Sequence, residues 1–250
     1  MSSWKKIVYK QIQPLHIGYG NYGVMNETRL FIPGITMWGA LTNAFGKENN
    51  WDKDQYEQNK AFFENITCFY PMIENAVLYP KFKNGEFYLG DKSEKEFRYE
   101  YVDTYVSTAI NPTTLNAKDE NLHEIDIILP QNKKEDKKQL YWVGHIKTSE
   151  KIPEEIYVGG DSRYGFGLMK LEREFEENYS YEVKKGIYQS RYLKNEPLLN
   201  FLEFESDKKF EGKIEILAEF DFSENRPKVN EAKYYIVPGS KIYANNRHDS

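Results

Sequence analysis

The segment PLHIGYGNYG, residues 14–23, carries three glycines in the spacing G-x-G-x-x-G. In dinucleotide-binding folds this spacing follows a strand and opens a helix, whose N-terminus receives the pyrophosphate. A strand over 5–17 is predicted before the loop, but the next helix is predicted to begin only near Thr36. The segment therefore argues against a dinucleotide site. It leaves two readings open, a loop that holds another phosphate and a simple turn.

Composition limits the classes of function that the chain can have. Its 250 residues make one large domain or two small ones, and 40% hydrophobic residues supply a core. A net charge of −5 excludes a generic polycationic nucleic-acid binder, so any polyanion contact depends on local arrangement of basic residues. Cys68 is the only cysteine, which excludes an internal disulfide and a cysteine-rich zinc site. No apolar run of about 18 residues occurs, so we expect a cytoplasmic protein without a membrane partner.

The hydrophobic pattern predicts an α+β protein. Helical spacing occurs in 36–46, which Thr36 can cap and Gly46 can end, and again in 52–65, which opens at Asp52. Short runs of β-branched and aromatic residues, separated by turns, predict strands through most of 67–145 and 179–243. Few helices among many short strands favour an α+β arrangement over a doubly wound sheet.

Four motifs follow one another in a specific order along residues 14–171. They are PLHIG at 14–18, TRLFIPGITMWGALTNAFG at 28–46, STAINPTTLNAKDENLHEIDII at 107–128 and GGDSRYGFGLMKL at 159–171. Taken together, the four resemble the RAMP superfamily of CRISPR-associated proteins. The remaining residues, up to 250, carry no part of this resemblance.

The resemblance implies a ferredoxin-like, RRM-type fold with an antiparallel sheet. It implies a core over 1–175 with a protruding hairpin, or thumb, inserted in about 80–145. Residues 176–250 would form a β-rich extension packed on that core, or a second, degenerate ferredoxin-like half. The implied function is a non-catalytic subunit of a type III-like effector in antiviral defence. Its expected partners are CRISPR guide RNA, the target RNA and other RAMP subunits, with no cofactor and no metal.

The candidate RNA-binding residues lie mainly in the two glycine-rich segments. Glycines let backbone N–H groups approach phosphate oxygens, Arg163 supplies a forked donor, and Tyr164 and Phe166 offer flat faces to bases. The same tyrosine and phenylalanine could instead be packing residues, and His16 a structural histidine. The candidates are His16, Gly18, Tyr19, Gly20, Asn21, Tyr22, Arg29, Gly34, Thr36, Gly159, Gly160, Arg163, Tyr164, Gly165, Phe166 and Gly167.

The alternative function is an endoribonuclease that processes guide RNA or slices target RNA. The resemblance implies that slicing subunits use an acidic residue, typically aspartate, in the loop after the first strand. This sequence has only Glu27 there, and His16 is the second catalytic candidate. Glu124 and Asp126 share one strand face, which favours an exposed strand edge over a metal site. We therefore expect a binding subunit rather than a nuclease.

Overall fold

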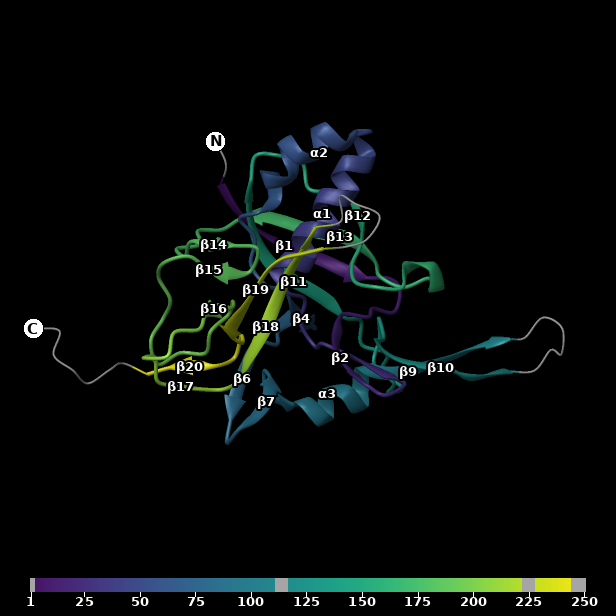
Figure 1. The fold of residues 1–250 in the computed structure, drawn as a ribbon. Helices are drawn as coiled ribbons and strands as arrows, with labels where there is room; N and C mark the ends of the chain where they lie inside the picture. Colours follow the sequence, from purple (N-terminus) through teal and green to yellow (C-terminus); the bar gives the residue numbers. More distant parts are fainter. Residues whose placement is uncertain (1–2, 111–116, 222–227, 244–250) are drawn as a thin grey trace, which may run out of the picture.

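The core of the protein is a six-stranded antiparallel sheet with the strand order β12-β13-β1-β11-β4-β5. The computed structural model describes residues 3–110, 117–221 and 228–243. The strands of this sheet are β1 Ser3–Gln11, β4 Tyr70–Ile73, β5 Ala76–Val77, β11 Tyr141–Thr148, β12 Glu155–Tyr157 and β13 Leu168–Glu176. Figure 1 shows them crossing the middle of the molecule beneath the first helix.

The order of the central strands, β13-β1-β11-β4, is that of a βαββαβ, or ferredoxin-like, sheet. Helix α1, Gly34–Glu48, connects β1 to β4 as that arrangement requires. The connection from β11 to β13 departs from it, because the described segment 149–167 holds β12 and a short 3₁₀ turn, Ser162–Tyr164, instead of a second α-helix. The predicted α+β class is confirmed.

Helix α1 packs on the sheet through its apolar face. Met37 and Leu41 are fully buried, as their helical spacing predicts. The predicted ends were wrong, since Pro33 is the N-cap residue and the helix runs through Gly46 to Glu48. Helix α2, Lys53–Asn59, starts as predicted at Asp52, which forms a capping box with Gln55, and the 3₁₀ turn Lys60–Phe63 follows it.

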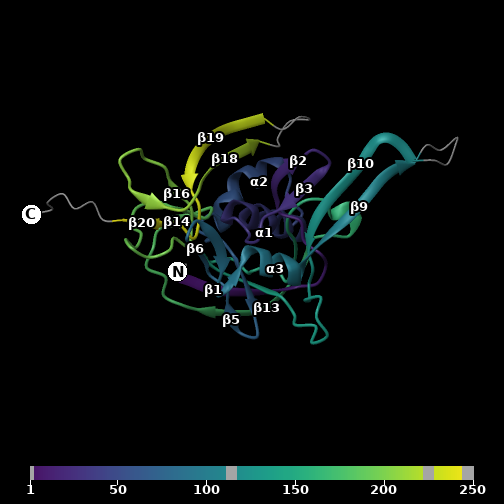
Figure 2. The same cartoon turned by 90° about the horizontal axis from the view of Figure 1, so that it is seen from below.

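A second sheet, of order β2-β3-β10-β9, carries the predicted protruding hairpin. Its strands are β2 Gly18–Tyr22, β3 Met25–Thr28, β9 Val102–Ile110 and β10 Ala117–Ile128. Strands β9 and β10, hereafter the thumb, project away from the body in both Figure 1 and Figure 2. Because β10 pairs with β3 on one side and β9 on the other, it is an inner strand. The prediction that Glu124 and Asp126 lie on an exposed strand edge was therefore wrong.

A small three-stranded sheet and the third helix come between β5 and β9 along the chain. They comprise β6 Pro80–Lys83, β7 Glu86–Leu89, β8 Lys92–Ser93 and α3 Glu94–Tyr101. Helix α3 begins with a capping box between Ser93 and Glu96 and buries Phe97 and Tyr101 in the main core. It leads directly into β9, so it forms the base of the thumb.

The C-terminal part packs on the core as several short sheets. Its strands are β14 Val183–Lys184, β15 Ile187–Tyr188, β16 Leu202–Glu203, β17 Phe210–Glu211, β18 Ile214–Asp221, β19 Lys228–Ile236 and β20 Lys241–Ile242. Phe31 and Tyr70 of the core form one buried cluster with Phe201 and Tyr235. The division into a core and an extension at about residue 175 stays a prediction. In the described part of the chain, no helix combines the length and apolar character needed to span a bilayer.

Candidate RNA-binding site

The two glycine-rich segments, far apart in sequence, contact each other. The Gly160 N–H donates to the His16 carbonyl oxygen at 3.1 Å, and the Gly167 N–H donates to that of Pro14 at 2.8 Å. Gly159 has φ +85°, and a Cβ there would lie 2.1 Å from the His16 carbonyl oxygen. Only glycine fits such an approach. The loop at 159–167 therefore lies directly beside the segment that leads into β2.

His16 is buried where the two segments join. Its Nδ1 lies 2.8 Å from the carbonyl oxygen of Asp126 on β10. A carbonyl oxygen can only accept, so Nδ1 carries the proton and donates it. The ring thus links the β1–β2 connection to the base of the thumb.

Aromatic side chains of the loop meet the thumb. Tyr105 of β9 has its ring centroid 5.7 Å from that of Tyr164 and 5.5 Å from that of Phe166. Phe166 is buried beside Ile125, whereas Tyr164 is 54% exposed. Arg163 is exposed and forms no ion pair among the described residues. Of the two predicted flat faces, Tyr164 alone is open to a base.

The hairpin formed by β2 and β3 offers further exposed groups. Tyr22 is 68% exposed and Tyr19 is 42% exposed, and Asn21 is exposed between them. The ring of Tyr22 lies over Gly20, where a Cβ would come within 3.2 Å of it. Gly18, at the start of β2, and Gly165, at the tip of the other loop with φ +82°, are also exposed.

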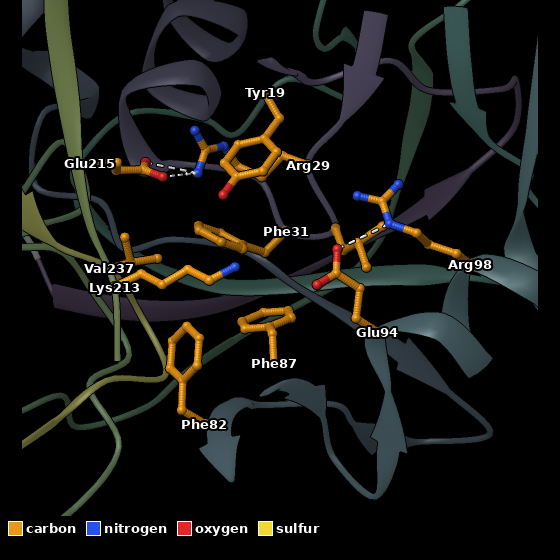
Figure 3. Close-up of a pocket in the computed structure, with 11 residues that line it drawn as sticks. Tyr19, Arg29, Phe31, Phe82, Phe87, Glu94, Arg98, Lys213, Glu215 and Val237 are labelled. Carbon is orange, nitrogen blue, oxygen red and sulfur yellow. Dashed lines mark hydrogen bonds and ion pairs between the residues drawn. The ribbon is translucent and has the colours of Figure 1, made fainter. Parts of the chain in front are cut away.

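Arg29 lies in a buried ion pair rather than on the open surface. Its Nη1 is 2.8 and 2.9 Å from the two carboxylate oxygens of Glu215 on β18. The guanidinium carbon lies 4.8 Å from the ring centroid of Tyr19 and 5.3 Å from that of Phe31. Figure 3 shows Arg29 between these rings, at the top of a small pocket that Lys213 also enters. Arg29 therefore ties the C-terminal part to the β2 hairpin.

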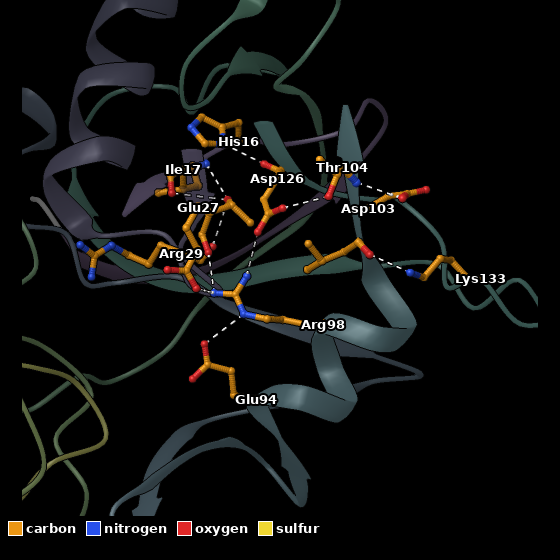
Figure 4. A network of polar contacts seen from close by, with 12 residues as sticks. His16, Ile17, Glu27, Arg29, Glu94, Arg98, Asp103, Thr104, Asp126 and Lys133 are labelled. Carbon is orange, nitrogen blue, oxygen red and sulfur yellow. Dashed lines mark hydrogen bonds and ion pairs between the residues drawn. The ribbon is translucent and has the colours of Figure 1, made fainter. Parts of the chain in front are cut away.

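Glu27, the acidic catalytic candidate, belongs to a network centred on Arg98 of α3. Arg98 Nη2 lies 2.6 Å from Glu27 Oε1 and 3.0 Å from the Thr28 carbonyl oxygen. The same guanidinium contacts Glu94 at 3.0 Å and Asp126 at 3.4 Å, as Figure 4 shows. Within the described residues, no group of three or more His, Cys, Asp or Glu side chains is placed to hold a metal ion.

A groove of about 1000 Å³ runs beside the glycine-rich loop. Helices α1 and α2, strand β12 and the hairpin of β18 and β19 line it, and the predicted residues Thr36 and Gly159 lie in its wall. Gly34 does not line the groove, because a Cβ there would come 2.3 Å from the Gly186 nitrogen of the C-terminal part. The predicted open N-terminus of α1 is thus covered.

The sequence reasoning missed several residues of the groove. Asn43 of α1, Tyr56 of α2 and Tyr157 before the glycine-rich loop all line it. Asn43 shares a helix face with Thr36 and Gly39. The small and polar residues on that face indicate, from the sequence alone, that it does not pack in the core. Arg98 was missed too, because no helix was predicted within 67–145, although the S-x-x-E pattern at 93–96 is typical of a capping box.

Solved structures with the same fold belong to CRISPR effector complexes. A chain of type III-B Cmr-beta bound to cognate target RNA and AMPPnP, state 1, matches with a TM-score of 0.65 and 16% identity, covering 95% of this chain and 85% of that one. A chain of Cmr-beta bound to cognate target RNA matches with a TM-score of 0.61 and 13% identity, covering 95% and 86%. These likenesses establish the fold.

Sequence comparison identifies the family. No curated protein sequence matches significantly. The model of the RAMP superfamily matches residues 9–170, from within β1 to within β13. This match includes both glycine-rich segments, the thumb and the whole of α1, and covers well over half of the 250 residues. The chain therefore belongs to the RAMP superfamily.

Proposed function

We propose that this chain is a non-catalytic subunit of a type III CRISPR effector ribonucleoprotein, where it binds guide RNA and helps assemble the complex for antiviral defence. Its family, and the Cmr-beta structures that share its fold, support this class of complex. The observation that carries the RNA-binding role is the contact between the two glycine-rich segments beside exposed aromatic side chains. Such a surface lets a nucleic-acid strand approach a glycine backbone closely and offers stacking platforms beside it.

The expected binding mode follows from the exposed groups. Arg163 would pair with a phosphate through its forked guanidinium, while Gly160 and Gly165 let the strand approach the backbone. Tyr164 and Tyr22 would stack on bases. The thumb stands beside this surface, which suits a role in interrupting the pairing between guide and target.

The geometry of the acidic side chains favours binding over cleavage. Glu27 and Asp126 both face the Arg98 guanidinium, and Asp126 also accepts from Thr104 at 3.2 Å. A carboxylate engaged in this way is poorly available as a general base or metal ligand. The proton on Nδ1 of His16 is likewise donated to a backbone carbonyl.

A binding and cleavage assay tests this function. We expect the purified chain to bind labelled repeat RNA, and a guide paired with its target, without cutting either in the presence or absence of divalent metal. Arg163→Ala should weaken binding by about 1–3 kcal/mol, the range for a charge-assisted contact. Arg173→Ala, which removes an exposed arginine from β13 instead, is the matched control.

The same assay decides between the two functions. Cleavage that either Glu27→Gln or His16→Ala abolishes would establish the endoribonuclease in place of the binding subunit. Equal losses of affinity in the Arg163 and Arg173 variants would remove Arg163 from the site.

A further inference from the structure

A small pocket lies where the C-terminal part meets the base of the thumb (Figure 3). It encloses about 40 Å³, which is room for roughly three water molecules. Its walls come from β2, from β6 and β7, from α3 and from the start of β18. The aromatic and aliphatic residues of its lining are Tyr19, Leu30, Phe31, Phe82, Phe87 and Val237. Only a group of a few atoms fits between them.

The charged side chains of the pocket leave one cation without a partner. Arg29 pairs with Glu215, and Arg98 pairs with Glu94 at 3.0 Å, so both carboxylates of the lining are neutralised. The other carboxylates that contact Arg98 do not line the pocket. Lys213 forms no ion pair among the described residues, and Figure 3 shows its side chain reaching into the pocket. The pocket therefore carries one unbalanced positive charge.

Two donors in this pocket lack an oxygen atom. Nε of Arg29 is buried and has no acceptor in the part of the chain that the structure describes. The Lys213 ammonium lies over the ring of Phe82, 6.0 Å from its centroid, rather than beside a carboxylate. Buried donors are nearly always paired with an acceptor. A carboxylate group supplies acceptor oxygens and a negative charge, and it is small enough for the space.

A second, open hollow of about 520 Å³ adjoins the pocket, because Glu215 lines both. Its other lining residues are Phe204, Ile214, Ile216 and Tyr234. Ile216 and Tyr234 are cross-strand partners and are 57% and 59% exposed. Contiguous exposed apolar side chains of this kind mark interaction surfaces.

The two hollows together favour a polypeptide ligand over RNA. The pocket holds only a group the size of a carboxylate, so the rest of any ligand lies outside it, against the apolar surface. An RNA strand carries a phosphate at every nucleotide and is bound by clusters of basic residues. Lys213 is the one unbalanced cation among the residues that line the two hollows, and the exposed isoleucines offer no donor to a phosphate.

We infer that residues 213–216 form a docking site for an acidic segment of a partner protein. One Asp or Glu side chain of that segment enters the pocket and pairs with Lys213, while apolar residues next to it cover Ile216 and Tyr234. The inference rests on the proposed function and specifies the surface through which the chain assembles with another protein. A single anchor in a pocket, with apolar contacts around it that exclude water, is typical of the strongest contacts in protein interfaces.

The test compares two synthetic peptides in NMR titrations of the full chain. They are acetyl-Ala-Ile-Glu-Ile-Ala-amide and the same peptide with Gln in place of Glu. The Glu peptide should bind at least about tenfold more tightly, the scale of one charge-assisted contact. Lys213→Met should abolish this preference, whereas Lys95→Met, which removes an exposed lysine of α3 outside the pocket, should preserve it. Both lysines are exposed, so the two variants should keep the melting temperature of the unaltered chain.

The apolar part of the site has its own pair of variants. Ile216→Thr should weaken binding of both peptides by at least about threefold, because it removes apolar surface that the peptide covers. Val229→Thr is the matched control, since Val229 is 55% exposed on the same hairpin but lines neither hollow.

Equal affinity for the Glu and Gln peptides, or binding of neither at up to about 1 mM, would overturn the inference. Labelled repeat RNA that displaces the Glu peptide and loses affinity in Lys213→Met would also overturn it, because the pocket would then belong to RNA. Either result leaves the proposed function standing as long as the chain binds repeat RNA. A chain that binds the Glu peptide but no RNA would instead contradict the proposed function and leave the docking site in place.

Discussion

Arg98 is the residue on which the base of the thumb depends. It connects α3 to β3 through Glu27 and the Thr28 carbonyl, and to β10 through Asp126. Its side chain is 20% exposed and those of Glu27 and Asp126 are 23% and 14% exposed, so the charges are partly screened by solvent. Removing the cation would leave carboxylates facing one another without compensation.

We expect Arg98→Met to lower the free energy of unfolding by about 1–3 kcal/mol, the cost of leaving part-buried polar groups unpaired. Urea denaturation measures this as a lower midpoint. Arg173→Met, at an exposed position on β13, should change stability by no more than about 0.5 kcal/mol. Equal midpoints for the two variants would contradict the role assigned to Arg98.

For single residues, the kind of interaction was easier to predict from the sequence than the partner in that interaction. Gly159 was predicted to allow a close backbone approach, and it does so, but the described contact is with the carbonyl of His16. The alternating pattern of residues 164–167 could not show that Tyr164 is exposed and Phe166 is buried. Phe166 is buried because it packs against Ile125 of the thumb, which is distant in the sequence. Arg29 was predicted to bind RNA, but it pairs with Glu215, which lies 186 residues away in the sequence. Charge pairing over such distances leaves no local pattern.

Among the elements, helix α1 contains two glycines with opposite structural roles. A Cβ on Gly34 would come 2.3 Å from the backbone nitrogen of Gly186, whereas one on Gly39 would meet nothing within 4 Å. Gly34 therefore joins the helix to the C-terminal part, while Gly39 faces the groove.

We expect Gly34→Ala to destabilise the protein by about 1–3 kcal/mol through overpacking. Gly39→Ala should be neutral or should stabilise it by up to about 1 kcal/mol through helix propensity. Thermal unfolding of the two variants makes the comparison. A Gly34→Ala protein as stable as the Gly39→Ala protein would show that the backbones can separate without cost.

Strand β11 carries a titratable group that couples stability to pH. His145 stacks on Tyr179 at 4.8 Å, and its Nε2 lies 3.6 Å from Glu177, which Lys6 also contacts. Burial lowers the pKa of His145, with Glu177 opposing the shift and Lys6 adding to it. As pH falls below the unfolded value of about 6.5, the unfolded chain takes up a proton before the native one does. This group therefore favours the native state less as pH falls.

The corresponding prediction is that stability decreases between about pH 7 and pH 5.5. His145→Phe, which keeps a ring against Tyr179, should flatten that part of the profile. Chemical denaturation at closely spaced pH values measures both slopes. The same slope in both proteins would mean that other groups cause the dependence.

Elements with a strong local pattern were predicted, and those without one were not. The buried face of α1 and the start of α2 at Asp52 were predicted from the sequence. Strand β12, Glu155–Tyr157, was not predicted as a strand, because it forms by pairing with β13. Helix α3 has only eight residues, and tertiary burial of Phe97 and Tyr101 stabilises it more than its own propensity does.

For the whole molecule, the order of four motifs predicted the fold of the first two thirds. The C-terminal part could not be predicted in detail, because β14, β15, β16, β17 and β20 have two residues each and show no periodicity. Their buried residues Val183, Tyr188, Leu202 and Ile242 pack together in one cluster, which Trp4 of β1 also contacts. Local sequence patterns do not predict packing between residues that are far apart in the sequence.

The separation of the groove walls along the chain has a consequence for biosynthesis. Helix α1 ends at Glu48, but the opposite wall is complete only at Ile236 of β19. Chains leave the ribosome N-terminal end first, at about 5–20 residues per second. A nascent polypeptide therefore lacks the second wall of the groove until the ribosome has synthesised the strands up to Ile236.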